Sequence, residues 1–246
     1  MKDGIELAKD ELQAAGWNVD VNYQDDGALS SRTITAVNFL KTQGVSLIIG
    51  PTWSAQAAAA KSVLESNEMV AYSPGGWSAV MGGSSPSLFF GTSLKLVDLQ
   101  AIKQVLSNER GKAKTGLIIC SEDPWGVAHQ VEYERILKSL GINILGEESF
   151  VYGQEETTIP IILTKYKSRQ PDVIITTGST EGLAITVKTM QKLKINSTVL
   201  TTKEIVQAIT WGLLPKGKLP FDIYYYSKNI NDDFVARFKA KFHKTP

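Results

Sequence analysis

A serine and a tryptophan stand on the short turn that follows an apolar segment of this chain. The turn reads GPTWSAQ from residue 50 to 56, after the apolar run 45–49 and before a run of alanines that is typical of a helix. Backbone N–H groups at the start of a helix, together with a hydroxyl, attract an anion such as a carboxylate. Ser54 is therefore a candidate contact for an anionic group. The competing interpretation is that Ser54, or Thr52, caps its own helix.

The sequence offers Ser54 no partner for nucleophilic catalysis. His129 and His243 are far apart and fall in different predicted elements, and Cys120 ends an apolar strand, where a core position is expected. The turn is not a Gly-x-Ser-x-Gly elbow, and neither a Gly-x-Gly-x-x-Gly nor a Gly-Lys-Ser phosphate loop occurs. No Cys/His spacing suits a metal, and the acidic pairs are expected to be solvated: Glu147–Glu148 and Glu155–Glu156. We therefore expect that the chain is not an enzyme and uses no cofactor.

Charge and hydropathy disfavour two kinds of partner. The 26 basic and 25 acidic residues nearly cancel and form no long block, which disfavours nucleic acid. No apolar stretch approaches the roughly 20 residues that span a bilayer. The opening residues MKDGIELAKDEL are typical of the middle of a helix, so we expect that a leader was left off. The single cysteine excludes an internal disulfide.

Strand-like and helix-like segments alternate almost from end to end. Apolar stripes or runs predict helices at 5–15, 34–40, 57–64, 98–108, 133–140, 157–169, 183–193 and 232–242. Short apolar or alternating runs predict strands at 19–23, 45–49, 69–73, 115–120, 142–150, 171–178, 197–202 and 221–227. Such alternation indicates an α/β protein with parallel sheets covered on both faces.

An irregular stretch divides the strands and helices into two series. Residues 73–91 are dense in glycine, proline and serine. We therefore expect two doubly wound, Rossmann-like lobes: lobe one in 1–92, lobe two in 93–226, and a return crossing toward lobe one in 227–246. In open sheets of this kind, ligands sit outside the carboxyl ends of the strands.

Several segments together resemble the type I periplasmic binding proteins, above all the leucine/isoleucine/valine-binding branch that serves ABC importers. They are GIELAKDELQAAG, IIGPTWSAQAAA, YSPGG, SEDPWGVAHQVEYERILKSLGINI and RQPDVIITTGSTEG, in this order and spacing. The resemblance implies a periplasmic or extracellular protein, or a membrane-anchored lipoprotein. It also implies capture of an amino acid, branched-chain or otherwise, or of an aromatic acid, by closure on a hinge near 91–97 and 226–230. A membrane permease would be the partner. The alternative is a ligand-sensing domain of a receptor or regulator with the same fold.

The resemblance also implies that lobe one is incomplete. Family members begin with a central strand of lobe one that nothing before residue 1 supplies, and they continue past the position of Pro246. Unpaired strand edges invite pairing with another chain. We therefore expect self-association through lobe one, or a second polypeptide that supplies the missing strand.

In lobe one, the resemblance implies three contacts with the ligand. Ser54 matches the serine that holds the ligand carboxylate, with Thr52 and Trp53 on the same turn. Gly75 would offer its carbonyl to the ligand ammonium. Trp77 stands where family members often carry a threonine. Its ring could stack on the ligand, narrow the pocket or face away, and Ser78 could supply the hydroxyl in its place.

In lobe two, the resemblance implies closure over the ligand. Trp125 matches an aromatic residue that covers the ligand, although burial against its own lobe is the competing interpretation. Ser179 and Thr180 head a helix where the family has another contact. Glu204 lies within one residue of the acid that binds the ammonium, and Lys203 occupies the other register. Three of the five tryptophans thus fall on predicted binding turns, which suits an apolar or aromatic ligand body.

Overall fold

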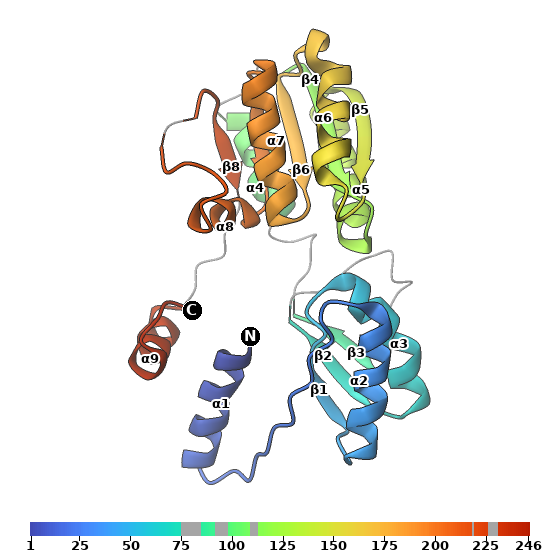
Figure 1. Cartoon of the computed structure of the whole chain (residues 1–246), viewed down its shortest axis with the longest axis vertical. Coiled ribbons are helices and arrows are strands. Elements are labelled where there is room, and N and C mark those ends of the chain that lie inside the picture. Colours follow the sequence, from blue (N-terminus) through green and yellow to red (C-terminus); the bar gives the residue numbers. More distant parts are fainter. Residues whose placement is uncertain (75–84, 92–97, 109–112, 218, 226–230) are drawn as a thin grey trace. The chain divides into compact units, whose positions relative to one another are not determined.

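In a computed structural model the chain forms two units (Figure 1). The structure describes residues 1–74, 85–91, 98–108, 113–217, 219–225 and 231–246. The smaller unit joins residues 1–25 to 227–246, and the larger unit is residues 26–226.

The smaller unit pairs the first helix of the chain with the last. These helices are α1 (Lys2–Ala14) and α9 (Asp232–Phe242). Lys241 Nζ lies 2.5 Å from the Asp10 carboxylate. Phe238, the buried residue of α9, packs beside its neighbouring phenylalanines on the same helix. Charge pairing between the helices and a small aromatic cluster therefore hold this unit together.

The alternating segment 19–23 is not a strand, which corrects the prediction made from its pattern. Residues 18–26 have no regular secondary structure, and none of the described strands pairs with them. A strand is stable only when its backbone N–H and C=O groups meet those of a neighbour. Alternation of apolar residues shows which side chains share a face, but it does not supply that neighbour.

In the larger unit, one group of described residues forms a three-stranded parallel sheet. Its order is β1 (Leu47–Ile49), β2 (Val70–Ser73) and β3 (Leu88–Phe90). The helices α2 (Ser30–Thr42) and α3 (Ser54–Ser66) follow the helical stripes in the sequence. The core of this part draws on both helices and on the strands: Val37, Leu40, Ala57, Ala60, Val63, Leu64, Met69, Ala71 and Leu88.

The other face of this sheet is apolar and exposed. Its residues alternate with those of the core and lie opposite one another in the strand register: Leu47, Ile49, Val70, Tyr72 and Phe89. Leu47 and Ile49 are 64% and 51% exposed, so the apolar run 45–49, which is typical of a buried strand, is exposed on one face. Successive side chains of a strand point to opposite faces, and only the face of Ile48 packs against the core of α2 and α3.

A second group of residues forms a five-stranded parallel sheet of order β5-β4-β6-β7-β8. Its strands are β4 (Thr115–Ser121), β5 (Asn143–Phe150), β6 (Val173–Thr177), β7 (Thr198–Thr201) and β8 (Ile223–Tyr225). Its helices are α4 (Asp98–Asn108), α5 (Pro124–Ser139), α6 (Glu155–Tyr166), α7 (Thr180–Leu193) and α8 (Glu204–Thr210), with a short 3-10 turn η2 (Lys167–Arg169). The predicted α/β class with parallel sheets is confirmed.

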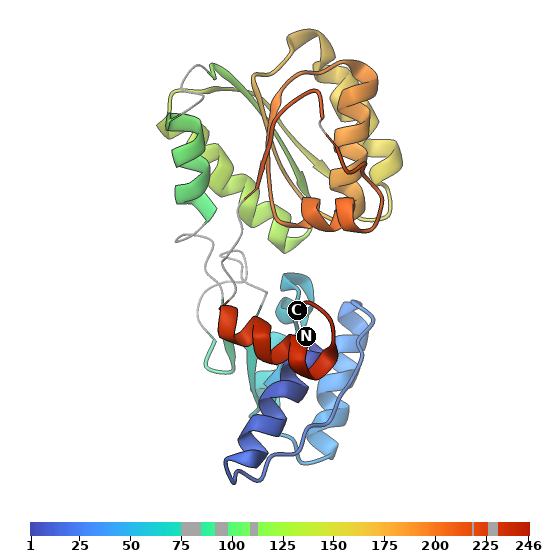
Figure 2. The same ribbon diagram turned by 90° about the vertical axis from the view of Figure 1, so that its left-hand side faces the viewer.

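Helices cover both faces of the five-stranded sheet. Figure 2 shows α4 and α5 on one side of it and α6 and α7 on the other. Leu117 and Ile119 of β4 pack with α6 and α7, whereas Ile118 and Cys120 pack with α4 and α5. Because β4 and β6 are central and covered on both sides, they read as continuous apolar runs.

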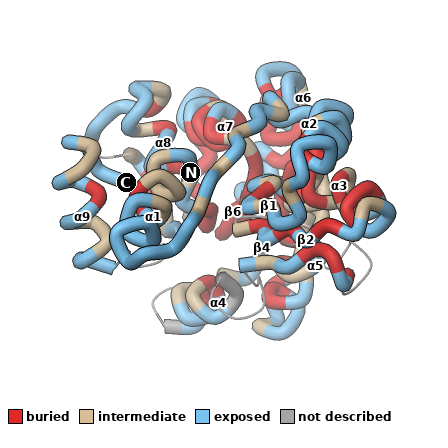
Figure 3. Tube along the Cα trace, turned by 90° about the horizontal axis from the view of Figure 1, so that it is seen from below, coloured by how far each residue is buried: buried red, intermediate tan, exposed pale blue. Residues whose placement is uncertain are grey.

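The helices of the smaller unit are far less buried than the centre of the five-stranded sheet. In Figure 3 the tube of β6 is buried along its length, whereas α1 and α9 are mostly exposed or intermediate, with one buried residue each. Among the described residues, no helix has the length and apolar character needed to span a bilayer.

Candidate functional site

The turn after β1 leads directly into α3. Trp53 is the N-cap residue, with extended backbone angles (φ −95°, ψ 147°), and an indole has no acceptor with which to cap a helix. Ser54 is the first helical residue and is 2% exposed. Thr52 lies exposed before the cap. Neither hydroxyl therefore occupies the N-cap position, at which Ser or Thr usually accepts from the free N–H groups of a helix.

Two buried polar residues beside this turn were not predicted. Ser73, at the carboxyl end of β2, donates a hydrogen bond to the carbonyl of Pro51 at 2.5 Å and so ties the turn to the sheet. Gln56, in the first turn of α3, donates to the carbonyl of Ala28 at 2.6 Å. Its Oε1 is buried and meets no hydrogen-bond donor in the described part of the chain. A serine at a strand end and a lone glutamine among alanines were the available signals.

Of the remaining predicted residues of lobe one, the described part of the chain includes only Trp53. Trp53 is 59% exposed. Gly75, Trp77 and Ser78 lie outside the described residues, as do the hinge segments 92–97 and 226–230.

Trp125 lies in the first turn of α5, which begins at the carboxyl end of β4. Its Nε1 donates to Thr177 Oγ1, on β6, at 3.2 Å. Asp123 is the N-cap of α5 and accepts from the backbone N–H groups of Trp125 and Gly126 at 3.3 and 3.1 Å. Ser121 donates to the same carboxylate at 2.5 Å. The indole is therefore held within its own part of the fold.

His129 lies one helical turn after Trp125 and was assigned no role from the sequence. Its side chain is fully buried, and its Nδ1 is 2.8 Å from the carbonyl of Trp125. Because a carbonyl only accepts, Nδ1 carries the proton. Its ring packs edge-on against that of Trp125, with 4.1 Å between centroids, and Tyr133 follows at 5.4 Å. Burial lowers the pKa of His129 to about 4, so the imidazole is neutral at pH 7.

Ser179 is the N-cap residue of α7. Its Oγ accepts from the backbone N–H of Gly182 at 2.9 Å and donates to Glu155 Oε1 at 3.0 Å. Glu155 is 8% exposed, and its other oxygen accepts from the N–H of Gly153 at 2.7 Å. This carboxylate was expected to be solvated, and the structure shows it buried and hydrogen-bonded instead. Thr180 donates to Gln207 Oε1 at 3.0 Å.

Glu204 begins α8, after the carboxyl end of β7. Its Oε2 is buried and has no hydrogen-bond partner among the residues described, whereas Lys203 is exposed. The hydroxyls of Thr201 and Thr202 are also buried without a partner in that part of the chain. Buried polar atoms without partners are uncommon in folded proteins and cost free energy. Three of them within four residues mark this strand end as a place for a polar ligand group or water.

Tyr152, which follows β5, is a further residue that was not predicted. Its hydroxyl is 3.4 Å from Ser121 Oγ, a long contact. Burial, and then the charges of Asp123, Glu155 and Glu204, raise its pKa to about 12. The phenol therefore stays protonated at neutral pH. A tyrosine just after a strand was the signal for it.

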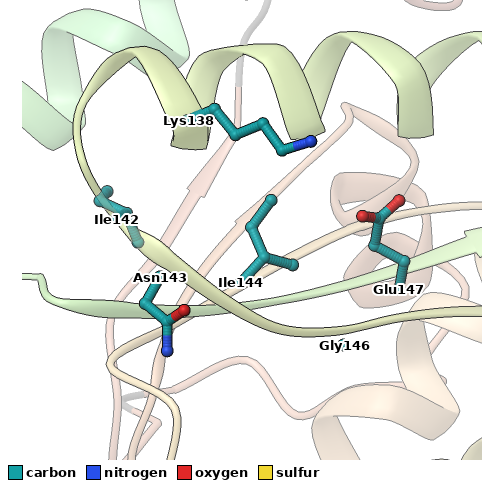
Figure 4. A pocket seen from close by; sticks show the side chains of 6 residues that line it. All are labelled: Lys138, Ile142, Asn143, Ile144, Gly146 and Glu147. Carbon is teal, nitrogen blue, oxygen red and sulfur yellow. The ribbon is translucent and has the colours of Figure 1, made fainter.

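A depression beside the edge strand β5 contains none of the predicted site residues. It has a volume of about 420 Å³ and is lined by Lys138, Ile142, Asn143, Ile144, Gly146 and Glu147 (Figure 4). The Lys138 ammonium pairs with Glu134 on its own helix. The depression follows the edge strand β5, away from the carboxyl ends of the central strands, and we assign it no role in binding.

The structure thus gathers polar and aromatic groups at the carboxyl edge of the five-stranded sheet. Trp125, Tyr152, Ser179 and Glu204 follow four different strands there, and Trp125 and Ser179 are joined to neighbours on other elements. Among the described residues there is no group of three or more His, Cys, Asp or Glu side chains placed to hold a metal. This edge offers hydrogen bonds, negative charge and an aromatic ring.

A family model described as "Periplasmic binding protein" matches residues 1–246. Comparison with curated protein sequences gives no match.

Solved structures show the same fold at low sequence identity. One is the branched-chain amino acid transporter substrate-binding protein LivJ from Streptococcus pneumoniae in complex with isoleucine, with a TM-score of 0.81 and 22% identity over 100% of this chain and 72% of that chain. Another is the leucine-binding protein LivK from Thermotoga maritima, with a TM-score of 0.81 and 19% identity over 99% and 71% of the two chains. A solute-binding protein of an ABC transporter from Rhodopseudomonas palustris, in complex with 3,4-dihydroxybenzoic acid, has a TM-score of 0.76 and 15% identity over 100% and 70%.

Proposed function

Because the chain belongs to the periplasmic binding protein family and has its type I fold, we propose that it captures an amino acid or a related small carboxylate for an ABC importer. Membership of this family places the chain outside the cytoplasm and makes it a binding protein rather than an enzyme. The ligand, the permease partner and attachment to the membrane as a lipoprotein are parts of the proposal.

The observation that carries this proposal is the buried carboxylate oxygen of Glu204, which has no hydrogen-bond partner within the described part of the chain. An ammonium group offers the charge and the N–H donors that this oxygen lacks. Asp123 and Glu155 add negative charge beside Tyr152. A second carboxylate would be repelled there, so we assign the ligand carboxylate to Ser54 and the start of α3. This arrangement favours an amino acid over an aromatic acid without an amine.

Capture proceeds by closure of two lobes. We propose that lobe one comprises residues 1–92, that lobe two comprises residues 93–226, and that residues 227–246 cross back toward lobe one. A ligand that contacts both lobes stabilises the closed form by the difference between its affinities for the two forms. Lobe one contacts the ligand through two turns: Thr52, Trp53 and Ser54 on the first, and Gly75, Trp77 and Ser78 on the second. Lobe two contacts the ligand through Trp125, Ser179 and Glu204.

A second part of the proposal is self-association through lobe one. The exposed apolar face of the three-stranded sheet (Leu47, Ile49, Val70, Tyr72 and Phe89) supports it, because contiguous apolar patches often mark interaction sites. The strand β1 is also at the edge of that sheet, where its backbone can pair with another chain.

A thermal-shift panel tests ligand binding. It contains L-leucine, L-isoleucine, 3,4-dihydroxybenzoate and 4-methylpentanoate, which is leucine without its amine. A ligand at 100 times its dissociation constant adds about 2.7 kcal/mol of stability. We expect L-leucine or L-isoleucine to raise the melting temperature, and 4-methylpentanoate to have little effect. No response to any of the four would refute the proposed ligand class.

Glu204→Gln tests the carboxylate itself. Loss of a charged hydrogen bond costs about 1.5–3 kcal/mol, which corresponds to about 10- to 150-fold weaker binding of the amino acid. Glu147→Gln, on the exposed edge strand β5, is the matched control and should bind normally. Equal affinities of the Glu204 variant and the unmodified protein would remove Glu204 from the site.

A further inference from the structure

The strands β4 and β6 lie side by side at the centre of the five-stranded sheet, and the chain leaves them in opposite directions. After β4 it enters α5, which packs on one face, and after β6 it enters α7, which packs on the other. Such a divergence is the switch point at which ligands approach open α/β sheets. The indole of Trp125 bridges this point, because its Nε1–H reaches Thr177 at the end of β6.

Trp125 is fixed from its backbone as well as from its ring. Gly126 follows it so close to β4 that an added Cβ would stand 1.9 Å from the carbonyl oxygen of Ser121. Only glycine permits this approach, which brings the first turn of α5 onto the strand. The carboxylate of Asp123 then holds the N–H of Trp125.

His129 contacts both the backbone and the indole ring of Trp125. Its Nδ1–H donates to the Trp125 carbonyl at 2.8 Å, and its ring lies edge-on at 4.1 Å from the indole. Tyr133 packs behind it, and both side chains are fully buried. The indole of Trp125 therefore packs against the buried side chain of His129, which in turn packs against that of Tyr133.

We propose that Thr177 and His129 are positioning residues, which fix the indole of Trp125 across the ends of β4 and β6 before any ligand arrives. This inference rests on the proposed function, and it defines what Trp125 offers. Its N–H is already donated to Thr177, so only the ring face is available to a ligand. The ligand group that meets Trp125 is therefore apolar, aromatic or cationic, rather than a hydrogen-bond acceptor.

The neighbouring Thr176 provides a matched control for Thr177. Both lie on β6 and are at most 1% exposed, but the Thr176 hydroxyl has no hydrogen-bond partner in the described residues. Valine replaces threonine with almost the same shape. Thr177→Val therefore removes the acceptor of the indole N–H. Thr176→Val removes a hydroxyl that makes no hydrogen bond with any described residue.

Solvent exchange of the tryptophan indole N–H groups, followed by NMR on the whole chain, tests the positioning without a ligand. Trp125→Phe assigns the signal. We expect Thr177→Val to speed exchange at Trp125 at least tenfold, Thr177→Ser to restore slow exchange, and Thr176→Val to change nothing. His129→Leu should shift the same indole signal. Unchanged exchange in Thr177→Val, or an equal change in Thr176→Val, would overturn the proposal.

Affinity for L-isoleucine supplies the functional readout. We expect Thr177→Val to weaken binding about tenfold while Thr176→Val and Thr177→Ser bind normally. Equal affinity of Thr177→Val and the unmodified chain would overturn the link from Thr177 to the ligand. Failure of the unmodified chain to bind any panel compound counts against the proposed function alone, because the exchange experiment decides the positioning independently.

Discussion

Stability should fall in mild acid because of one buried imidazole, that of His129. In the folded chain its pKa is about 4, and its ordinary value is 6.5. The unfolded chain therefore binds more protons than the folded chain between these values. Stability from this residue is fully present above pH 6.5 and is lost as the pH falls toward 4.

The magnitude follows from the two pKa values. A tenfold difference in proton affinity is worth 1.36 kcal/mol, so the full loss is about 3 kcal/mol, of which about 2 kcal/mol is reached at pH 5. In a domain of about 200 residues, 2 kcal/mol corresponds to a fall of about 4–8 °C in melting temperature.

Urea unfolding at pH 7 and pH 5 measures this loss. His129→Gln should lose stability at both pH values from altered packing, but its loss between pH 7 and pH 5 should be about 2 kcal/mol smaller than that of the unmodified chain. The carboxylates titrate in both proteins and cancel in the comparison. His243→Gln, at an exposed position, leaves His129 and its surroundings in place and should keep the full loss. The same pH dependence in His129→Gln as in the unmodified chain would refute the reasoning.

Two further pairs of substitutions test association and packing. Ile49→Lys should lower the oligomer fraction in light scattering, because it places a charge on the exposed apolar face, whereas Ile161→Lys, at an exposed site on α6, should not. A monodisperse monomer of the unmodified chain would contradict the self-association. Glu155→Ala should cost about 1–3 kcal/mol in urea unfolding, because it strands the donors of Ser179 and Gly153. A double-mutant cycle with Ser179→Ala should show coupling between the two, and strict additivity would contradict a working hydrogen bond.

The sequence predicts well the elements whose pattern and neighbours agree. The apolar runs at 115–120 and 171–178 indicate central strands, and β4 and β6 lie there, because burial on both faces leaves no polar alternation to obscure them. The segments 19–23 and 45–49 show the limit of this reasoning. Their apolar residues are real, but a strand at 19–23 needs a neighbour, and the exposure of Ile49 depends on which face the helices cover.

The candidate site was predictable in position more than in detail. The turns after strands are visible in the sequence, so Ser54, Trp125 and Ser179 could be named. The hydrogen bond from Trp125 to Thr177 joins residues 52 positions apart, and no local pattern indicates it. The burial of His129 likewise follows from the direction in which α5 packs, which apolar spacing alone does not fix.

The pairing of α1 with α9 has a consequence for the order in which the parts of the fold form. The Glu11 carboxylate meets the Arg237 guanidinium 226 residues later in the chain. Contacts between residues so far apart cost more loop-closure entropy than the contacts within either sheet, whose strands are closer in sequence. The helix pair is therefore expected to form after the two sheets.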